Sequence, residues 1–315
     1  MSEAKEVIIR IRRYNEQKGE YWSEYMLKVD KYTQMTEALR LIKAHQDPSI
    51  SYRASCHMAV CGSCGMKING APKLACKTRV LEEAEKNNGM VIVEPMSYYK
   101  VVKDLVVDME PFYEKMEKVI PRLMPSKEVE EGQVEPRLLP ETQETLWRHG
   151  QCIWCGLCVS MCPVLPIDDN FLGPAAHAKA FRFIFDPRDT LTQERLKIVA
   201  ESAWRCTYCY QCVQACPRDI EPAETIIKTR KETFKLKQSS PSLNLGRKHS
   251  VALKKSISET GKVEGATVFV GSYGLSKSIR DLIYQFRENP DSLANYLIRQ
   301  KKVSDIESIK KIVGE

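Results

Sequence analysis

The sequence predicts an α+β protein, in which a small mixed sheet with a helix on one face precedes a helical half and a helical C-terminal extension. Three observations support this prediction. Apolar and polar residues alternate in the first part of the chain, as in strands. From about residue 174 onwards apolar residues repeat at helical spacing instead. All twelve cysteines lie in three tight groups that end at Cys216, with none left over.

The N-terminal part is expected to form strands around one helix. Val7, Ile9 and Ile11 alternate with polar residues, which is typical of a half-buried strand. Asn69-Gly70 lies between two apolar runs and is a strong hairpin signal. We therefore expect strand, strand, helix, hairpin and strand, over residues 7–11, 25–29, 35–42, 66–76 and 90–93.

Four cysteines fall within this predicted sheet, three in one loop and one on the hairpin. They are Cys56, Cys61, Cys64 and Cys76. C-x4-C-x2-C with a distant fourth cysteine is the plant-type spacing of a [2Fe–2S] cluster. Gly62 and Gly65 can adopt positive φ and let backbone N–H groups approach the cluster. His57 also lies in this loop, but four cysteines already suffice, so we expect it to be a surface or cluster-shielding residue and not a ligand.

A second cysteine pattern, C-x2-C-x2-C-x3-C-P, occurs twice, over residues 152–163 and 206–217. In two-cluster ferredoxins the cysteine before the proline binds the other cluster, because the short chain does not easily curl back to its own cage. We therefore expect one cubane cluster to be held by Cys152, Cys155, Cys158 and Cys216. We expect the other cubane cluster to be held by Cys162, Cys206, Cys209 and Cys212. The aromatic residues beside these ligands are expected to screen the clusters from water: Trp154, Trp204, Tyr208 and Tyr210.

Zinc and disulfides are the alternative uses of these cysteines. Structural zinc also uses Cys-x2-Cys pairs, but three evenly spaced cysteines followed by Cys-Pro do not match zinc-ribbon spacing. Disulfides need an oxidising compartment and would be strained in such short loops. The pattern therefore favours iron–sulfur clusters in a reducing compartment.

The segments around the cubane motifs are expected to be mainly helical. Residues 98–123 carry an apolar helical stripe interrupted at Pro111, which predicts two helices that pack one domain onto the next. Residues 124–144 are rich in Pro and Glu and are predicted to be a linker. A helix is expected over 174–185, followed by a second one that Thr190 caps. His177, within the first of these helices, is interpreted as structural.

The cysteine-free end of the chain has a different character. Ser239-Ser-Pro-Ser242 marks a break, and helices are expected near 276–288 and 291–313. Its basic residues outnumber its acidic ones, which is usual for a solvated face. A docking surface for a partner and a stabilising tail explain this extension equally well.

Composition and charge exclude several classes of protein. The hydrophobic fraction of 43% and the charged fraction of 28% are ordinary for a globular protein. There is no run of about eighteen apolar residues, and the first residues are too short and too charged for a signal peptide. The net charge of +7 can partly balance thiolates bound to iron. Without aromatic-interleaved basic runs, no nucleic-acid partner is expected.

The three cysteine groups, in this order, resemble the iron–sulfur subunit of succinate dehydrogenase or fumarate reductase. The resemblance covers about residues 7–235 and includes the motifs Arg53-Ala-Ser-Cys56, Val60-Cys-Gly-Ser-Cys64, Leu74-Ala-Cys76-Lys-Thr78, Gly173-Pro-Ala175 and Arg205-Cys206. It implies four parts: a β-grasp [2Fe–2S] ferredoxin domain, a connecting helix and linker, an α-helical ferredoxin domain with two cubane clusters, and a C-terminal extension. Their boundaries are 1–105, 106–145, 146–237 and 238–315.

The resemblance also implies a function, partners and a location. The subunit would carry electrons from the FAD of a succinate dehydrogenase flavoprotein, through one [2Fe–2S] and two cubane clusters, towards a quinone or a Cys-rich anchor subunit. It would have no substrate site of its own and would lie, as a peripheral subunit, on the cytoplasmic face of the cell membrane. The first alternative is the iron–sulfur subunit of a thiol-dependent fumarate reductase or another flavin dehydrogenase. A zinc-stabilised scaffold and a free ferredoxin carrier are more remote alternatives.

Two departures from the family pattern concern the second cubane cluster. Family members usually lack a cysteine at the position of Cys209 and hold a [3Fe–4S] cluster there, so the presence of Cys209 predicts [4Fe–4S] in place of [3Fe–4S]. Thr207 and Val164-Leu-Pro166 replace the usual histidine and tryptophans of the quinone pocket, so quinone would be reached indirectly. The tail around Arg247 faintly resembles heterodisulfide reductases, which implies a non-classical, archaeal-like enzyme with a Cys-rich partner.

Overall fold

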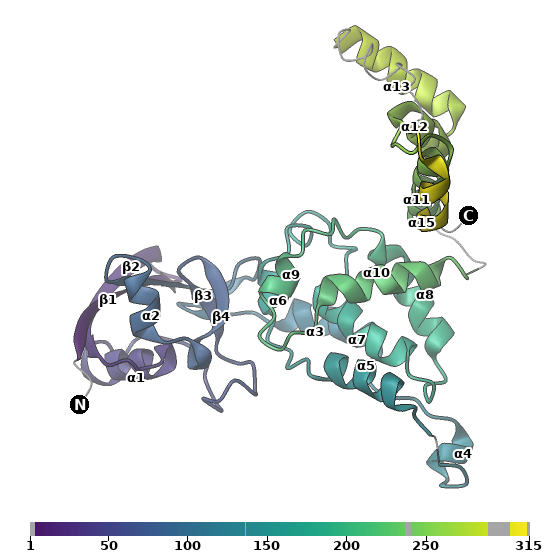
Figure 1. Cartoon of the computed structure of the whole chain (residues 1–315). Coiled ribbons are helices and arrows are strands. Elements are labelled where there is room, and N and C mark those ends of the chain that lie inside the picture. Colours follow the sequence, from purple (N-terminus) through teal and green to yellow (C-terminus); the bar gives the residue numbers. More distant parts are fainter. Residues whose placement is uncertain (1–3, 136, 237–240, 289–302, 314–315) are drawn as a thin grey trace. The chain divides into compact units, whose positions relative to one another are not determined.

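A computed structural model describes residues 4–135, 137–236, 241–288 and 303–313 (Figure 1). The chain divides into two compact units, Met1–Thr233 and Phe234–Glu315. The first unit contains all twelve cysteines in two successive parts, a sheet part and a helical part. The second unit is helical. The predicted α+β class is therefore confirmed.

The sheet part contains a five-stranded mixed sheet with the strand order β2-β1-β5-β3-β4. Its elements are β1 (Lys5–Asn15), β2 (Gly19–Val29), α1 (Met35–His45), β3 (Gly65–Ile68), β4 (Ala71–Leu74), the 3-10 helix η1 (Ala75–Lys77), α2 (Val80–Glu85) and β5 (Met90–Glu94). β1 pairs antiparallel with β2 and parallel with β5. Asn69 and Gly70 both have positive φ, 50° and 78°, as a tight hairpin between β3 and β4 requires. The predicted order of elements in this part is confirmed.

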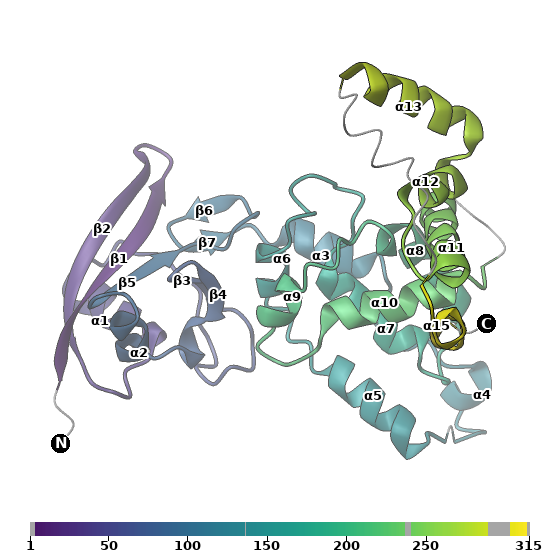
Figure 2. The ribbon, with the colours of Figure 1, turned by 45° about the horizontal axis from the view of Figure 1, so that its top comes forward.

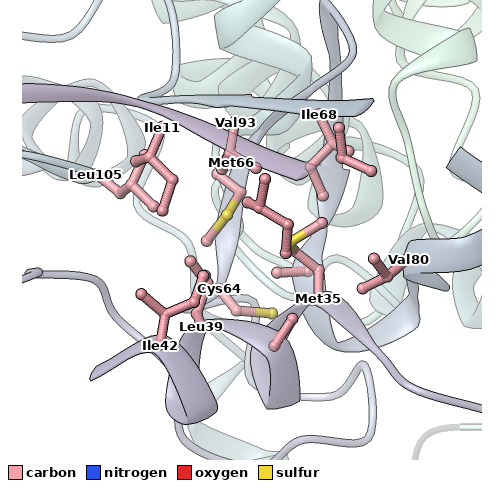
Figure 3. Packing of buried hydrophobic residues seen from close by; sticks show 14 of the residues in the cluster. Ile11, Met35, Leu39, Ile42, Cys64, Met66, Ile68, Val80, Val93 and Leu105 are labelled. Atoms are coloured by element: carbon pink, nitrogen blue, oxygen red, sulfur yellow. The ribbon is translucent and has the colours of Figure 1, made fainter. Parts of the chain in front are cut away.

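The core of this part lies between the sheet and α1, and α1 and α2 lie on the same side of the sheet (Figure 2). Ile9 and Ile11 follow each other on one face of β1 and are fully buried, which explains the alternation seen in the sequence. Figure 3 shows strand residues and α1 residues facing one another: Ile11, Met66, Ile68 and Val93 on strands, and Met35, Leu39 and Ile42 on α1. Cys64 lies in the same core, so this cysteine is anchored by packing.

The helix predicted over the first half of residues 98–123 is wrong. Val101–Lys103 and Val106–Val107 form strands β6 and β7 of a small hairpin, and only Glu110–Glu117 is helical, as α3. The valines of this segment are β-branched, which favours strands. Pro111 lies in the first turn of α3, where its missing N–H costs nothing, so it starts a helix instead of interrupting one.

A buried arginine holds the β6–β7 hairpin to the sheet. The Arg13 side chain is 2% exposed, and its Nε donates to Asp104 Oδ1 at 2.7 Å in the turn of the hairpin. Its Nη1 donates to Asp47 Oδ2 at 2.8 Å and to the Tyr25 hydroxyl at 2.8 Å. Asp104 also accepts the backbone N–H of Ser51 at 2.8 Å. Asp104 is 1% exposed, so this turn is fixed by a fully paired buried charge.

The helical part contains two short helices after the cysteine loops and longer helices that pack around α7. Its elements are α4 (Lys127–Glu130), α5 (Pro140–Gly150), α6 (Leu157–Ser160), α7 (Pro174–Ile184), α8 (Thr192–Ala203), α9 (Gln211–Gln214) and α10 (Pro222–Thr233). α7 contacts α5, α8 and α10, while α6 contacts α9. The predicted helix over 174–185 is confirmed. The predicted linker over 124–144 is wrong in part, because it contains α4 and the first turn of α5.

The capping role predicted for Thr190 is also wrong. α8 begins at Thr192, and the Thr190 hydroxyl donates to the carbonyl of Met124 at 2.8 Å. The neighbouring Asp189 accepts the backbone N–H of Met124 at 3.1 Å and pairs with Arg195 at 3.0 Å, both side chains being fully buried. This pair fixes the connecting segment against α8, and sequence spacing alone does not reveal such a tertiary role.

The second unit is described by α11 (Pro241–Thr260), α12 (Gly265–Tyr273), α13 (Leu275–Glu288) and α15 (Ile306–Val313). The helix predicted near 276–288 is confirmed as α13. The helix predicted near 291–313 is confirmed over 306–313, while residues 291–302 lie outside the described residues. Within the described part of the chain, none of the helices has the length and apolar character needed to cross a membrane.

Candidate iron–sulfur sites

The loop between α1 and β3 places its cysteines around one point next to η1. The Cys56 thiol accepts the backbone N–H groups of Val60 at 3.4 Å and Cys61 at 3.3 Å. The Cys76 thiol, which comes from η1, accepts the N–H of Ala59 at 3.2 Å. The structure therefore brings the distant Cys76 to the loop that carries the other cysteines, as the spacing predicts.

Left-handed backbone conformations turn this loop inward. His57, Ala59 and Gly62 have φ of 54°, 58° and 74°, in a region that non-glycine residues rarely adopt. Such conformations direct consecutive N–H groups into a concave site that binds anions, including iron–sulfur clusters. The positive φ was predicted from the sequence for Gly62 but not for His57 and Ala59, and the same prediction for Gly65 is wrong, because Gly65 begins strand β3. The His57 side chain is exposed, in agreement with its predicted non-ligand role.

The cysteines of this loop differ in their surroundings. Cys64 and Cys76 are buried, and burial raises the pKa of the Cys64 thiol to about 12. Cys61 is exposed, and a hydrogen bond from Ser63 lowers the pKa of its thiol to about 6. A buried thiol stays protonated unless a metal ion takes the place of the proton. The donor set therefore fits a metal cluster held half in the core and half at the surface.

The first cubane set is complete in the structure. Cys152, Cys155, Cys158 and Cys216 all line one small cavity, together with residues of α7. Burial raises the pKa of the Cys155 thiol to about 12 and that of Cys158 well above its usual range. Cys216 comes from the second motif, and the structure places it beside the three cysteines of the first motif.

The second cubane set is brought together as well. Burial raises the pKa of the Cys162 thiol, and the negative charges of Cys209 and Cys206 raise it further. Burial and the charges of Cys206, Cys209 and Cys162 together raise the pKa of the Cys212 thiol to about 12. Cys162 comes from the first motif and packs beside Cys206. Cys209 is exposed, whereas Cys162 and Cys212 are buried.

The two cysteine loops repeat the same backbone shape. Trp154 and Gly156 in the first loop have φ of 57° and 75°, and Tyr208 and Tyr210 in the second have φ of 57° and 59°. The backbone N–H of Trp154 donates to the Cys152 thiol, and in the same way the N–H of Tyr208 donates to the Cys206 thiol. These are the inward-facing N–H arrays that iron–sulfur sites use. The sequence repeat predicted the loops, but aromatic residues in left-handed conformation give no signal in a sequence.

Arg230, on α10, holds the second loop. Its guanidinium lies 4.1 Å from the ring centroid of Tyr208 and 4.9 Å from that of Trp204. It donates to the carbonyls of Cys206 at 2.7 Å and Ala203 at 2.8 Å. The aromatic residues Tyr208 and Trp204 thus stack on a partly buried cation. Sequence analysis missed Arg230, because only the fold brings α10 beside this loop.

The plant-type loop lies directly against the first cubane loop. A Cβ added to Gly62 would lie 2.7 Å from the carbonyl oxygen of Ile153 and 2.9 Å from Cys155 Cβ. A Cβ on Gly65 would lie 3.2 Å from the Cys155 carbonyl oxygen. Glycine is therefore required here for close approach, and the first and second cysteine sites are neighbours.

The remaining candidates have ordinary roles. His177 is fully buried, its Nε2 lies 2.8 Å from Ser202 Oγ, and its ring stacks on Phe171, so it is structural as predicted. In the part of the chain that the structure describes, no three His, Cys, Asp or Glu side chains are grouped as ligands of a single metal ion.

Two family models match the two parts of the first unit. A 2Fe-2S iron–sulfur cluster binding domain matches residues 8–114, and a 4Fe-4S dicluster domain matches residues 148–220. The two matches lie over the plant-type loop and over both cubane motifs, respectively. The chain therefore carries iron–sulfur clusters of both kinds.

Curated relatives span most of the chain. The fumarate reductase iron–sulfur subunit of Haemophilus influenzae is 34% identical over 72% of this chain and 93% of its own length. That of Mycobacterium tuberculosis is 38% identical over 70% and 90%, respectively. The succinate dehydrogenase iron–sulfur subunit of Coxiella burnetii is 37% identical over 64% and 83%. A chain of the Mycobacterium smegmatis Sdh1 complex in the apo form has a similar structure, with a TM-score of 0.67 and 27% identity over 76% of this chain and 99% of that chain.

Proposed function

Because the chain belongs to the family of iron–sulfur subunits of succinate dehydrogenase and fumarate reductase, we propose that it is the electron-transfer subunit of a succinate dehydrogenase. The observation that carries this proposal is that Cys216 lines one cavity with Cys152, Cys155 and Cys158, while Cys162 packs beside Cys206, which supports a crossing between the two cubane sets. That crossing makes two sites interdependent and adjacent, which an electron carrier needs and a zinc scaffold does not.

The proposed ligands are the three sets of cysteines. Cys56, Cys61, Cys64 and Cys76 would hold the [2Fe–2S] cluster; Cys152, Cys155, Cys158 and Cys216 a [4Fe–4S] cluster; and Cys162, Cys206, Cys209 and Cys212 the second cubane. When bound, such clusters accept and release single electrons. Four thiols in the last set support four irons rather than three.

The chain's own residues would position and insulate these centres. The N–H groups turned inward at Ala59, Trp154 and Tyr208 donate to thiols, and such hydrogen bonds favour the more negative state of a cluster. Gly62 lets the first site lie against the second. Burial of Cys162 and Cys212 keeps water from the inner side of the second cubane site. Site order along the molecule is then plant-type loop, first cubane set, second cubane set.

The partners we propose are a flavoprotein subunit that carries FAD and a membrane-anchor or Cys-rich subunit. The exposed Cys61 and Cys209 support electron entry at the first site and exit at the last. We also propose a peripheral position on the cytoplasmic face of the membrane, with quinone reached through the anchor. We propose that substrate binds to the flavoprotein, so that the reaction partners of that subunit decide the overall chemistry.

The second candidate is the reverse reaction, fumarate reduction, including its thiol-dependent form. The names of the Haemophilus influenzae and Mycobacterium tuberculosis relatives favour it. Purified complex assayed with succinate and an artificial dye tests the proposal: dye reduction supports succinate oxidation, and inactivity with succinate but activity with fumarate and a reduced donor supports the alternative.

A further inference from the structure

Helix α13 exposes a continuous apolar stripe. Leu275, Ile279 and Ile283 are four residues apart, so they lie on one face of the helix. These three side chains are 65%, 48% and 58% exposed. Single exposed apolar residues are normal on a protein surface, but a row of large ones marks an interaction site.

The buried side of α13 is small and polar where the structure describes it. α13 contacts α12, and among its described side chains the buried one is Ser278, which is 6% exposed and donates to the carbonyl of Gly274 at 2.7 Å. Leu275, Ile279 and Ile283 are exposed, so they are available to another surface.

Basic side chains flank the stripe. Lys277, Arg280 and Arg287 are exposed on α13, and the helix also carries Asp281 and Glu288. Over residues 239–315 the sequence has thirteen Lys and Arg against eight Asp and Glu, so the whole extension is basic. Basic residues beside a row of Leu and Ile are typical of helices that lie in the interface of an anionic lipid bilayer.

The length of α13 decides how it could meet a bilayer. A helix of 14 residues is roughly 21 Å long, which is shorter than the hydrocarbon core of about 30 Å. It can lie in the plane of the interface, with the stripe inserted among the acyl chains and the basic side chains at the headgroups.

We propose that α13 binds an anionic lipid membrane directly, with Leu275, Ile279 and Ile283 inserted at the interface. This deepens, and rests on, the peripheral membrane position proposed above. It gives the chain a membrane contact of its own, in a region outside both matched family models, which end at residue 220.

Vesicle co-sedimentation of the full-length chain, kept anaerobic so that its clusters persist, tests this proposal. Phosphatidylcholine vesicles with and without phosphatidylglycerol are the probes. The chain is expected to pellet with the anionic vesicles, less so at high salt, because salt screens the headgroup charge. Replacing one isoleucine of the stripe with serine should lower the membrane partition coefficient of the chain roughly tenfold. An I279S/I283S double variant should therefore bind at least tenfold more weakly than the unchanged chain.

The matched control is Val263→Ser, which also removes an exposed apolar side chain from the second unit, 53% exposed, but not from the stripe. It should bind as the unchanged chain does. Three outcomes would overturn the proposal: no binding to anionic vesicles, equal binding of the double variant, or equal binding to neutral vesicles. Self-association of the chain on size exclusion that the double variant abolishes, without vesicle binding, would assign the stripe to a second copy instead.

Cluster content separates this proposal from the proposed function. The double variant should keep the iron content and spin-resonance spectra of the unchanged chain, because α13 holds no cysteine. Vesicle binding by a chain without clusters would leave the membrane contact standing and refute the electron-transfer role alone.

Discussion

Replacing Gly62 with alanine should disturb the contact between the first and second cysteine sites. The added Cβ would lie 2.7 Å from the Ile153 carbonyl oxygen, whereas ordinary contact begins at 3.4 Å, so the two loops must separate by about 0.7 Å. Left-handed φ costs an alanine about 1 kcal/mol, and overpacking adds about 1–3 kcal/mol. We therefore expect Gly62→Ala to lower the free energy of unfolding by about 2–4 kcal/mol.

Gly19→Ala is the matched control for this prediction. Gly19 has φ of 68°, close to the 74° of Gly62, but a Cβ there meets nothing within 4 Å. It should therefore cost only about 1 kcal/mol, from its backbone conformation alone. Anaerobic denaturation followed by circular dichroism measures both variants. Spin-resonance spectra of the reduced protein should show weaker magnetic coupling between the [2Fe–2S] and first cubane centres in Gly62→Ala only. Equal losses of stability in the two variants, with unchanged coupling, would refute the reasoning.

Three further predictions address the sheet core, the helical core and the last cluster. Arg13→Met should lower the free energy of unfolding by about 3–5 kcal/mol, because it leaves the buried Asp104 unpaired. Arg12→Met, which removes an exposed pair with Glu20, should lower it by under about 1 kcal/mol. Similar losses for the two variants in denaturation would contradict this. Burial lowers the pKa of His177 to about 3 in the folded protein. The imidazole therefore binds a proton more readily in the unfolded state, so the stability that is present above about pH 6.5 is lost as the pH falls. Between pH 7.5 and 5 the free energy of unfolding of the unchanged chain should fall by about 2 kcal/mol more than that of His177→Phe. Parallel pH profiles of the two proteins would contradict this prediction. Cys209→Ser should leave the fold intact and convert the second cubane towards three irons in spin-resonance spectra; complete loss of that centre would disagree with the exposed position of Cys209.

The parts of the fold that follow from local patterns were predictable. The alternation of Val7, Ile9 and Ile11 and the Asn69-Gly70 turn determine strands and a hairpin with little help from the rest of the chain. The cysteine groups were predictable for the same reason, since spacing within a loop limits which cluster it can wrap. The proposed crossing of Cys162 and Cys216 rests on the cluster geometry and not on any local propensity.

The errors arise where tertiary contacts override local patterns. The stripe over residues 98–123 fits a helix, but Asp104 is drawn into a buried pair with Arg13, and a hairpin forms around it. Thr190 resembles a cap, but it donates to Met124, which is distant in sequence. Arg230 could not be predicted at all, because its role depends on α10 lying beside the second cysteine loop.

The most direct test of the central idea, that cysteines from both motifs share two cubane sites beside a third, is elemental analysis of anaerobically purified protein combined with spin resonance. Three distinct centres and about ten irons per chain, with a similar amount of acid-labile sulfide, are expected. Stoichiometric zinc without labile sulfide, or a single centre, would contradict it.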